Sequence, residues 1–520
     1  MEVSTREKKP FHPDYGIMLV PLIIVGGIAA TFFIWPEGAT NTLTVIRAFI
    51  NTYLSSWIGL VGIASLVASL VIAFSPLGKI RLGNSKPMPR FQWSAIIFTT
   101  TICSDVLFYG ICEWSFYIDD PYVTSRPGAL QDWVPTMSLF HWGPTVWSFM
   151  LVLAAGFGFM MHIRNTRSRK LSEACRGLLG RRVDGPIGRI IDILAIFAVY
   201  ASIASSFGIN IPAIGDALGA IFGFTAGPWF YIALILVSCL IYTISAWIGM
   251  KSISWFSTVC VWLFGGLLVY AFLFSGRPMF LVETAVTSIG NFLNNFISIS
   301  TQLDPMRQTD FPQNWTLFYW CYWLTWGIGA PFLIAQISGG RTIRQLIVEG
   351  YAWGVSGTWL SFLVMGNYGM SLQLVDGMNF SGEIAAGVPA STVAVEILNT
   401  LPLPKLVLMV AAIVMFLLLT TCLDSTALVV GAFSEPYLTI DELPDRRIRL
   451  FWSILLIVMP IALLFARGSL ENIQSVCIIA AFPLSIVLIL CVAAFFKEGF
   501  AYVKAPPESA AEQIPAEDPE

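Results

Sequence analysis

Long runs of apolar residues constrain this chain more than any other feature of its sequence. A run of about 20 apolar residues crosses the hydrocarbon core of a bilayer as one helix. Of the 520 residues, 56% are hydrophobic and only 12% are charged. We therefore predict an all-α polytopic membrane protein. Twelve runs have spanning length: residues 15–35, 54–75, 93–117, 142–163, 190–212, 228–250, 255–275, 315–337, 351–373, 404–433, 449–466 and 473–496.

The lysine and arginine residues indicate how these helices are oriented. Short loops on the cytoplasmic side of membrane proteins are enriched in both residues. If both termini, residues 1–14 and 497–520, are cytoplasmic, most of the 29 basic residues fall on that side. We therefore expect a multi-pass protein of the plasma membrane with both termini inside. The exceptions on the outer side are Arg47, Arg126, Arg277, Arg307, Lys405 and Arg467.

The segments between the apolar runs contain no soluble catalytic domain. Residues 276–314 form the longest outer connection, in which residues 284–300 are predicted to be an amphipathic helix on the membrane surface. Three scattered histidines and nine cysteines without a CxxC pair indicate neither a metal cluster nor a disulfide framework. The net charge of −3 gives no indication of nucleic-acid binding. No cofactor is expected.

Residues 315–326 are unusually rich in aromatic side chains. Tyr319, Tyr322, Trp323 and Trp326 recur at helical spacing, so they form one continuous stripe on a helix. Aromatic faces attract a permanent cation that cannot donate hydrogen bonds, such as a trimethylammonium group. The alternative is that these rings pack against other helices or lie in an interfacial belt.

Three acidic residues stand out within the apolar runs, where a charge is costly and points to function. They are Asp105 and Glu113 in the third run and Asp424 in the tenth. Asp105 lies midway along its run, and no Lys or Arg occupies a similar depth elsewhere. A substrate cation or a proton is therefore its expected complement. A carboxylate that hydrogen-bonds to hydroxyl groups for packing is the alternative.

Further residues around these runs have chemistry suited to ions or aromatic ligands. At the start of the fourth run, Trp142 and Trp147 add possible aromatic walls, and His141 is expected at the outer interface in a structural role. In the eighth run, two glycines and a proline at residues 327–331 predict a discontinuous helix. The hydroxyl-rich residues 420–426 either bind a hard cation such as sodium or pack neighbouring helices.

Four motifs together resemble the betaine/choline/carnitine transporter (BCCT) family, over nearly the whole chain. They are Phe-His-Trp-Gly-Pro at 140–144 with Trp147, WTxFYWxxW at 315–323, ISxGRTIR at 337–344, and Asp424-Ser425. The combination is specific, although no single motif is.

This resemblance implies a fold and an assembly. The fold would contain two inverted five-helix repeats (the LeuT-like arrangement), residues 93–275 and 315–496, preceded by two extra helices in residues 15–92. The assembly would be a homotrimer to which the surface helix contributes.

The resemblance also implies where a small quaternary ammonium substrate would bind. Tyr322 stands where the family usually has Trp, and Met150 where it often has Tyr, so selectivity should differ from that of the best-known betaine carriers. An acidic residue at the position of Asp105 resembles the choline-type branch, and a carboxylate favours a net cation over a zwitterion. The implied substrate-binding residues are Trp142, Trp147, Tyr322, Trp323, Trp326 and Asp105.

Both sodium and a proton are candidates for the coupling ion. Thr421 matches the family's hydroxyl ligand for sodium, whereas Cys422 stands where serine is usual and is a poor ligand for a hard cation. The backbone carbonyls of Thr99 and Ile102 would complete that site. Asp105 is equally suited to carry a proton. The resemblance implies that osmosensing members have a basic C-terminal tail. The tail of this chain is acidic, so activation by hyperosmotic stress is not expected.

The leading hypothesis is a secondary active transporter of quaternary ammonium compounds that works by alternating access, with a cation such as choline favoured. Its first alternative is a zwitterion carrier, either a sodium-coupled glycine betaine importer or an exchanger of the carnitine type. A membrane-embedded enzyme acting on choline-like head groups is a hypothesis of another class, but no nucleophile lies between His141 and Asp105. A ligand-gated sensor would need a signalling domain that the sequence does not contain.

Overall fold

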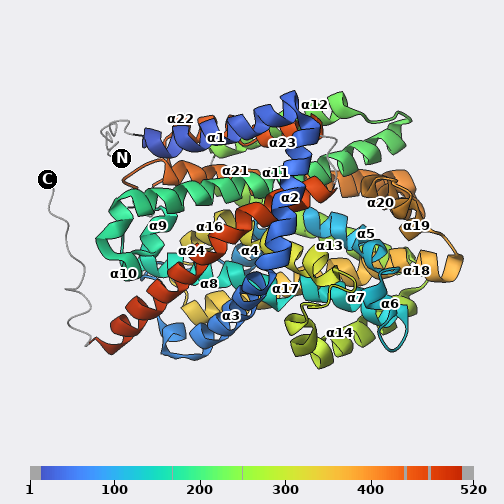
Figure 1. Ribbon diagram of the computed structural model, residues 1–520, viewed down its shortest axis with the longest axis horizontal. Helices are drawn as coiled ribbons and strands as arrows, with labels where there is room; N and C mark the ends of the chain where they lie inside the picture. Colours follow the sequence, from blue (N-terminus) through green and yellow to red (C-terminus); the bar gives the residue numbers. More distant parts are fainter. Residues whose placement is uncertain are drawn as a thin grey trace.

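The computed structural model describes residues 13–102, 104–166, 168–248, 250–438, 442–465 and 470–505, and most of them are helical (Figure 1). The predicted cytoplasmic tails, residues 1–14 and 497–520, lie partly outside the described residues. The first half contains α1 (Tyr15–Ile34), α2 (Pro36–Tyr53), α3 (Ser55–Phe74), α4 (Arg90–Ile102), α5 (Asp105–Tyr117), α6 (Pro121–Thr124), α7 (Leu130–His141), α8 (Pro144–His162), α9 (Leu171–Ala174), α10 (Arg176–Leu179), α11 (Pro186–Phe222), α12 (Pro228–Ile248) and α13 (Met250–Phe274).

The second half begins with α14 (Pro278–Thr301), at the place of the predicted surface helix, and ends with the long α24 (Leu470–Lys504). Between them lie the π-helical turn η3 (Pro312–Thr316), α15 (Leu317–Thr325), α16 (Gly329–Ile337), α17 (Ile343–Ser361), the π-helical turn η4 (Phe362–Gly366), α18 (Asn367–Asp376), α19 (Phe380–Ala385), α20 (Ala390–Asn399), α21 (Pro404–Phe433), α22 (Arg446–Leu455) and α23 (Val458–Phe465).

Local sequence signals explain where many helices begin and end. Proline occupies the first position of α2, α8, α11, α14 and α21, where its missing N–H is not needed. The side chain of Asp14 caps α1 by accepting a hydrogen bond from the amide of Ile17. Gly223 and Gly377 end α11 and α18 in the left-handed conformation.

Nine helical segments of the described chain are long and apolar enough to cross a membrane, or ten if a bent pair counts as one span. This confirms the prediction of an all-helical, multi-pass membrane protein. Each of the twelve predicted runs falls on helix, but the third and ninth do not meet the criterion for a span. The third run is divided between α4 and α5, and the ninth is interrupted by the π-helical turn η4.

The predicted discontinuity in the eighth run is confirmed. Residues 312–325 and 329–337 form two helical pieces that are bent by 52° across a break at residues 326–328. A second break, between α4 and α5, was not predicted from the sequence. Both breaks lie in the interior, because α5 and α15 are buried along almost their whole lengths.

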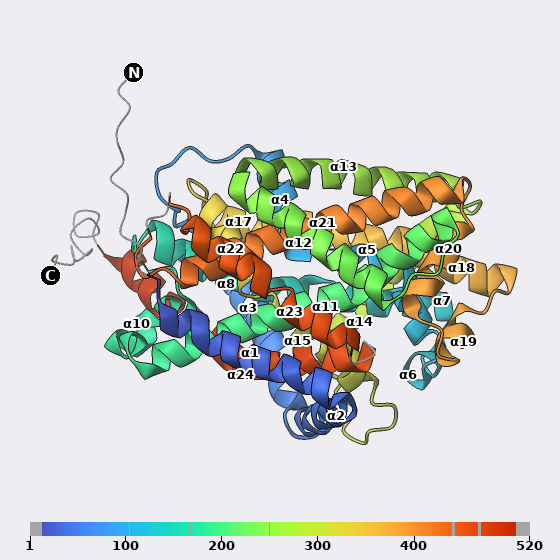
Figure 2. The same cartoon turned by 90° about the horizontal axis from the view of Figure 1, so that it is seen from above.

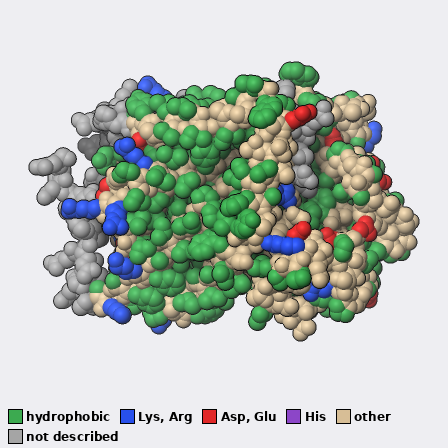
Figure 3. Space-filling model, viewed as in Figure 1, with side chains coloured by type: hydrophobic (Ala, Val, Ile, Leu, Met, Phe, Trp, Pro, Cys, Tyr) green, Lys and Arg blue, Asp and Glu red, His purple; other side chains and the backbone are tan. Residues whose placement is uncertain are grey.

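The two ends of the described chain lie at the same end of the molecule, close to α9 and α10 (Figure 2). Hydrophobic side chains cover the middle of the face seen in Figure 3, and Lys and Arg gather towards the end that carries the termini. α11 packs on both α21 and α24, and α8 packs on α3 and α16. This packing surrounds the two helix breaks.

Candidate functional site at two helix breaks

The two helix breaks are joined by a hydrogen bond between Asp105 and Tyr322. Asp105 is the first residue of α5, directly after the first break, and Tyr322 lies one turn before the second break. The Tyr322 hydroxyl donates to the Asp105 Oδ2 atom. Two residues that the sequence analysis assigned to the substrate site therefore meet, although 217 positions separate them.

Asp105 is buried and accepts hydrogen bonds from two further side chains, both of α11. Ser206 donates to Oδ2 at 2.5 Å, and the amide nitrogen of Asn210 donates to Oδ1. The amino-terminal end of α5 also favours a negative charge at this position. Among the described residues Asp105 has no Lys or Arg partner, so neutral donors and a helix end stabilise its carboxylate without cancelling its charge.

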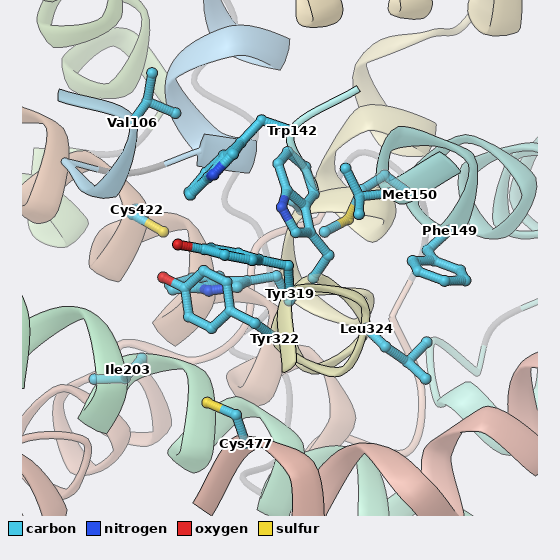
Figure 4. Packing of buried hydrophobic residues seen from close by; sticks show 14 of the residues in the cluster. Val106, Trp142, Phe149, Met150, Ile203, Tyr319, Tyr322, Leu324, Cys422 and Cys477 are labelled. Carbon is cyan, nitrogen blue, oxygen red and sulfur yellow. The ribbon is translucent and has the colours of Figure 1, made fainter. Parts of the chain in front are cut away.

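Three of the predicted aromatic residues form one cluster beside this carboxylate. The ring centroid of Trp323 is 5.6 Å from that of Trp142 and 5.4 Å from that of Trp147. All three side chains are buried, and they come from α15, the α7–α8 junction and α8. Figure 4 shows Trp142 and Tyr322 turned towards the same interior region, with Met150 to one side.

Trp326, the fifth predicted aromatic, lies at the second break as the C-terminal cap of α15. Its side chain is buried, but among the described residues it has no aromatic ring partner. The structure instead adds Tyr319 and Tyr109 to the cluster, since each has its ring 5.5 Å from that of Trp142. The aromatic surface therefore extends from Trp147 to Tyr109.

Glu113, the second buried acidic residue of the third run, holds Trp142 in place. The indole N–H of Trp142 donates to Glu113 Oε2 at 2.6 Å. His141 lies beside it, hydrogen-bonded at 2.9 Å both to Tyr117 through Nδ1 and to Thr316 through Nε2. His141 is 0% exposed, so the protein itself encloses this side chain at the end of α7. The rings of Tyr319 and Phe311 stack on the His141 ring and help to bury it.

Asp424 differs from Asp105 because it has a basic partner. Ser245 donates to Asp424 Oδ2 at 2.5 Å, and the guanidinium of Arg449 in α22 interacts with the carboxylate electrostatically. Arg449 is the first residue of the eleventh apolar run, and the packing of α22 on α21 brings it near Asp424. This geometry supports a structural role for Asp424.

The residues predicted for a sodium site lie on two helices that pack against each other, α4 and α21. Thr99 is buried, and its hydroxyl donates to the hydroxyl of Ser257 at 2.7 Å. The Thr421 hydroxyl donates to the carbonyl of Leu417 at 2.8 Å. Ile102 is the last residue of α4, next to the first break, and Cys422 follows Thr421 in a buried turn of α21.

Ser206, Asn210 and Gly354 are site residues that sequence reasoning missed. Ser206 and Asn210 are polar residues four positions apart in an apolar run, which places both on one helix face and was a usable signal. Gly354 gave no such signal. A methyl group at Gly354 would come within 2.4 Å of the Trp147 ring, so the absence of a side chain allows that ring to lie against α17.

A multi-pass helical protein in which two broken helices meet at a buried acidic and aromatic site is typical of secondary transporters. Residues 16–502 match the sequence profile of the BCCT, betaine/carnitine/choline family transporter. The chain belongs to this family, and it is therefore a membrane transporter and not an enzyme.

Three relatives show the range of the family. The chain is 30% identical to a probable glycine betaine transporter of Desulfitobacterium hafniense, over 90% of this chain and 95% of the relative. It is 28% identical to the high-affinity choline transport protein of Escherichia coli K12, over 83% of this chain and 64% of the relative. It is 24% identical to a carnitine transporter of Acinetobacter baumannii, over 89% of this chain and 82% of the relative. The three identities are similar although the relatives are named for different substrates, so they do not indicate which substrate this chain transports.

Proposed function

We propose that the protein is a secondary active transporter of quaternary ammonium compounds and that its substrate is a cation such as choline. The observation that carries the proposal is the Asp105–Tyr322 hydrogen bond, which places a carboxylate without a basic partner beside the aromatic cluster. Rings of Trp142, Trp147 and Trp323 suit a trimethylammonium group. Trp326, at the second break, would close the site when the helices move.

The head group of the substrate is proposed from the acceptors around Asp105. Asn210 Oδ1 is buried and has no hydrogen-bond partner among the described residues, and Asp105 Oδ1 has one donor. A hydroxyl group such as that of choline can donate to either atom. The carboxylate of a zwitterion would be repelled by Asp105.

A zwitterion carrier, for glycine betaine or carnitine, is the second candidate. The indole N–H groups of Trp147 and Trp323 are buried and have no acceptor among the described residues. These donors would suit a substrate carboxylate. The names of relatives that carry glycine betaine and carnitine also support this candidate.

The coupling ion is proposed to be sodium or a proton, with a different site for each. Sodium would be bound by the carbonyls of Thr99 and Ile102 and by the side chain of Thr421, with Cys422 as a weak fourth ligand. A proton would be carried by Asp105.

The positions of the two helix breaks support the LeuT-like repeat and alternating access. The two broken helices are the first helices of the proposed repeats, residues 93–275 and 315–496, so the breaks fall at corresponding positions. We propose twelve membrane crossings, with the basic end of the molecule and both termini in the cytoplasm. We also propose a homotrimer of the plasma membrane, in which α14 takes part in assembly.

Tryptophan fluorescence of the purified transporter tests the proposal. Choline and glycine betaine are each titrated with sodium and with an equal concentration of potassium. Saturable quenching by choline but not betaine is expected. Betaine binding alone would overturn the role given to Asp105 and favour the zwitterion carrier. Sodium dependence would support the site at Thr421, and dependence on pH without sodium would support the proton.

A further inference from the structure

A cavity of about 420 Å³ lies at the basic end of the molecule, away from the aromatic cluster. It is formed between the α3–α4 connection and the turn that joins α16 to α17. Its lining includes three arginines, Arg81, Arg90 and Arg341, together with Thr342 and Gln345 at the start of α17. The volume is in the range of small-molecule sites.

Backbone pairing fixes the walls of this cavity. An isolated antiparallel bridge pairs Arg81 with Thr342. The amide of Leu82 donates to the carbonyl of Arg341 at 2.8 Å. Gly340 adopts a φ of +77°, and a side chain there would come within 2.1 Å of the Ser85 carbonyl oxygen. The two segments are therefore held in close register before any ligand binds.

Arg341 is the buried member of the three arginines. It is 4% exposed, its guanidinium carbon lies 4.2 Å from the centroid of the Trp93 ring, and its Nη2 donates to the Met88 carbonyl at 2.7 Å. The Nε–H is buried and has no partner among the described residues. A buried, unsatisfied donor on a charged group is costly, so an acceptor at this position would be strongly favoured.

The other two arginines carry charges that the protein neutralises only in part. Arg81 uses Nε to donate to the Gly340 carbonyl at 3.1 Å, and its side chain is exposed. Arg90 is 3.4 Å from Glu349, but with its side chain 73% exposed this pair contributes little. Burial lowers the pKa of Arg341, nearby Glu349 raises it, and the charge of Arg90 lowers it. Three like charges thus meet around one cavity.

The start of α17 adds a further electropositive feature. Thr342 caps this 19-residue helix, and its first turn contains no acidic residue. The positive end of the helix dipole is therefore directed at the cavity. Guanidinium groups match phosphate oxygens in geometry and charge.

We propose that this cavity is a binding site for a phosphate group, carried by an anionic phospholipid or by a free phosphate compound. The three arginines would supply the positive charge that holds the phosphate oxygens. Since the cavity lies where α4 and α17 begin, and these helices pack against each other, its occupancy would stabilise the contact between them. This inference does not depend on which substrate the aromatic site takes.

The experiment compares retention of lipid with binding of free phosphate. The purified transporter is exchanged into detergent with phosphatidylglycerol or phosphatidylcholine, and retained lipid is measured by native mass spectrometry. In parallel, the thermal midpoint is measured against inorganic phosphate, with chloride at equal ionic strength. Selective retention of phosphatidylglycerol would identify a lipid head group, and a phosphate-specific rise in the midpoint would identify a free phosphate compound.

Variants test whether the cavity is responsible. Arg81→Gln with Arg90→Gln changes only exposed side chains, and it should weaken the selective binding by about tenfold or more. Arg182→Gln, at an exposed arginine outside the cavity, is the matched control and should leave binding unchanged. Arg341→Gln should have the larger effect if it folds. Absence of selective binding, or equal losses in the double variant and the control, would overturn the proposal.

Discussion

Trp323 is the residue on which the proposed substrate site depends most, because its ring contacts both Trp142 and Trp147. Trp323→Ala should weaken choline binding by about 30-fold or more, since a desolvated cation–π contact contributes about 2 kcal/mol. The measurement is the fluorescence titration described above.

A matched control separates binding from stability. Trp320 is equally buried in α15, but its ring packs near Phe140 and beside Gly62. Trp320→Ala should lower stability by a similar amount, about 3–5 kcal/mol, and should retain binding. Unchanged affinity in Trp323→Ala would remove α15 from the site.

Asp105 should determine whether the transporter prefers a cation or a zwitterion. Asp105→Asn keeps the size of the side chain and removes its charge, so the ratio of choline to betaine affinity should fall by about tenfold or more. Competition of both ligands for one labelled substrate measures the ratio. Asp424→Asn breaks the interaction with Arg449, and we expect it to reduce stability with no change in the ratio. A constant ratio in Asp105→Asn would make the carboxylate structural.

At the level of elements, the contact between α17 and α8 positions the Trp147 ring. Gly354→Ala would bring a methyl group to within 2.4 Å of that ring, so the ring must shift. We expect choline affinity to fall several-fold while the protein remains folded. Substrate titration and the thermal midpoint together measure the two effects.

The same helix supplies the control for this substitution. Gly350 lies one turn away on the same face of α17, and a methyl group there meets Leu151 Cδ2 at 2.4 Å. Because Leu151 lies outside the aromatic cluster, Gly350→Ala should lower stability without changing affinity. Equal losses of affinity in both variants would show that α17 acts through general packing and not through Trp147.

At the level of the whole molecule, the distribution of charge predicts which end is cytoplasmic. Asn84 is exposed in the α3–α4 connection at the basic end, and Ser125 is exposed at the end of α6. In intact cells a membrane-impermeant maleimide should label Ser125→Cys and not Asn84→Cys. All eight cysteines that the structure describes are buried, so background labelling should be low. Reversed labelling would invert the proposed orientation.

The sequence predicted the helices better than the contacts between them. The apolar runs and the break near Gly327 were recognised because membrane length and glycine–proline content are local properties. The break before Asp105 was missed because a Thr-Thr-Ile-Cys-Ser segment has no comparable local signal. The proposed site residues were found as separate patterns, yet Ser206, Asn210 and Gly354 required knowledge of which helices are neighbours.

The sequence by itself determined that this chain is a multi-pass helical membrane protein of the BCCT family. Both conclusions follow from hydropathy and from residues that are close together in the chain. Only the tertiary structure decided which buried charges have basic partners. Asp424 lies near Arg449 while Asp105 meets Tyr322, Ser206 and Asn210, and each pairing joins helices that are distant in sequence. The physical reason is that the cost of a buried charge depends on its neighbours in space.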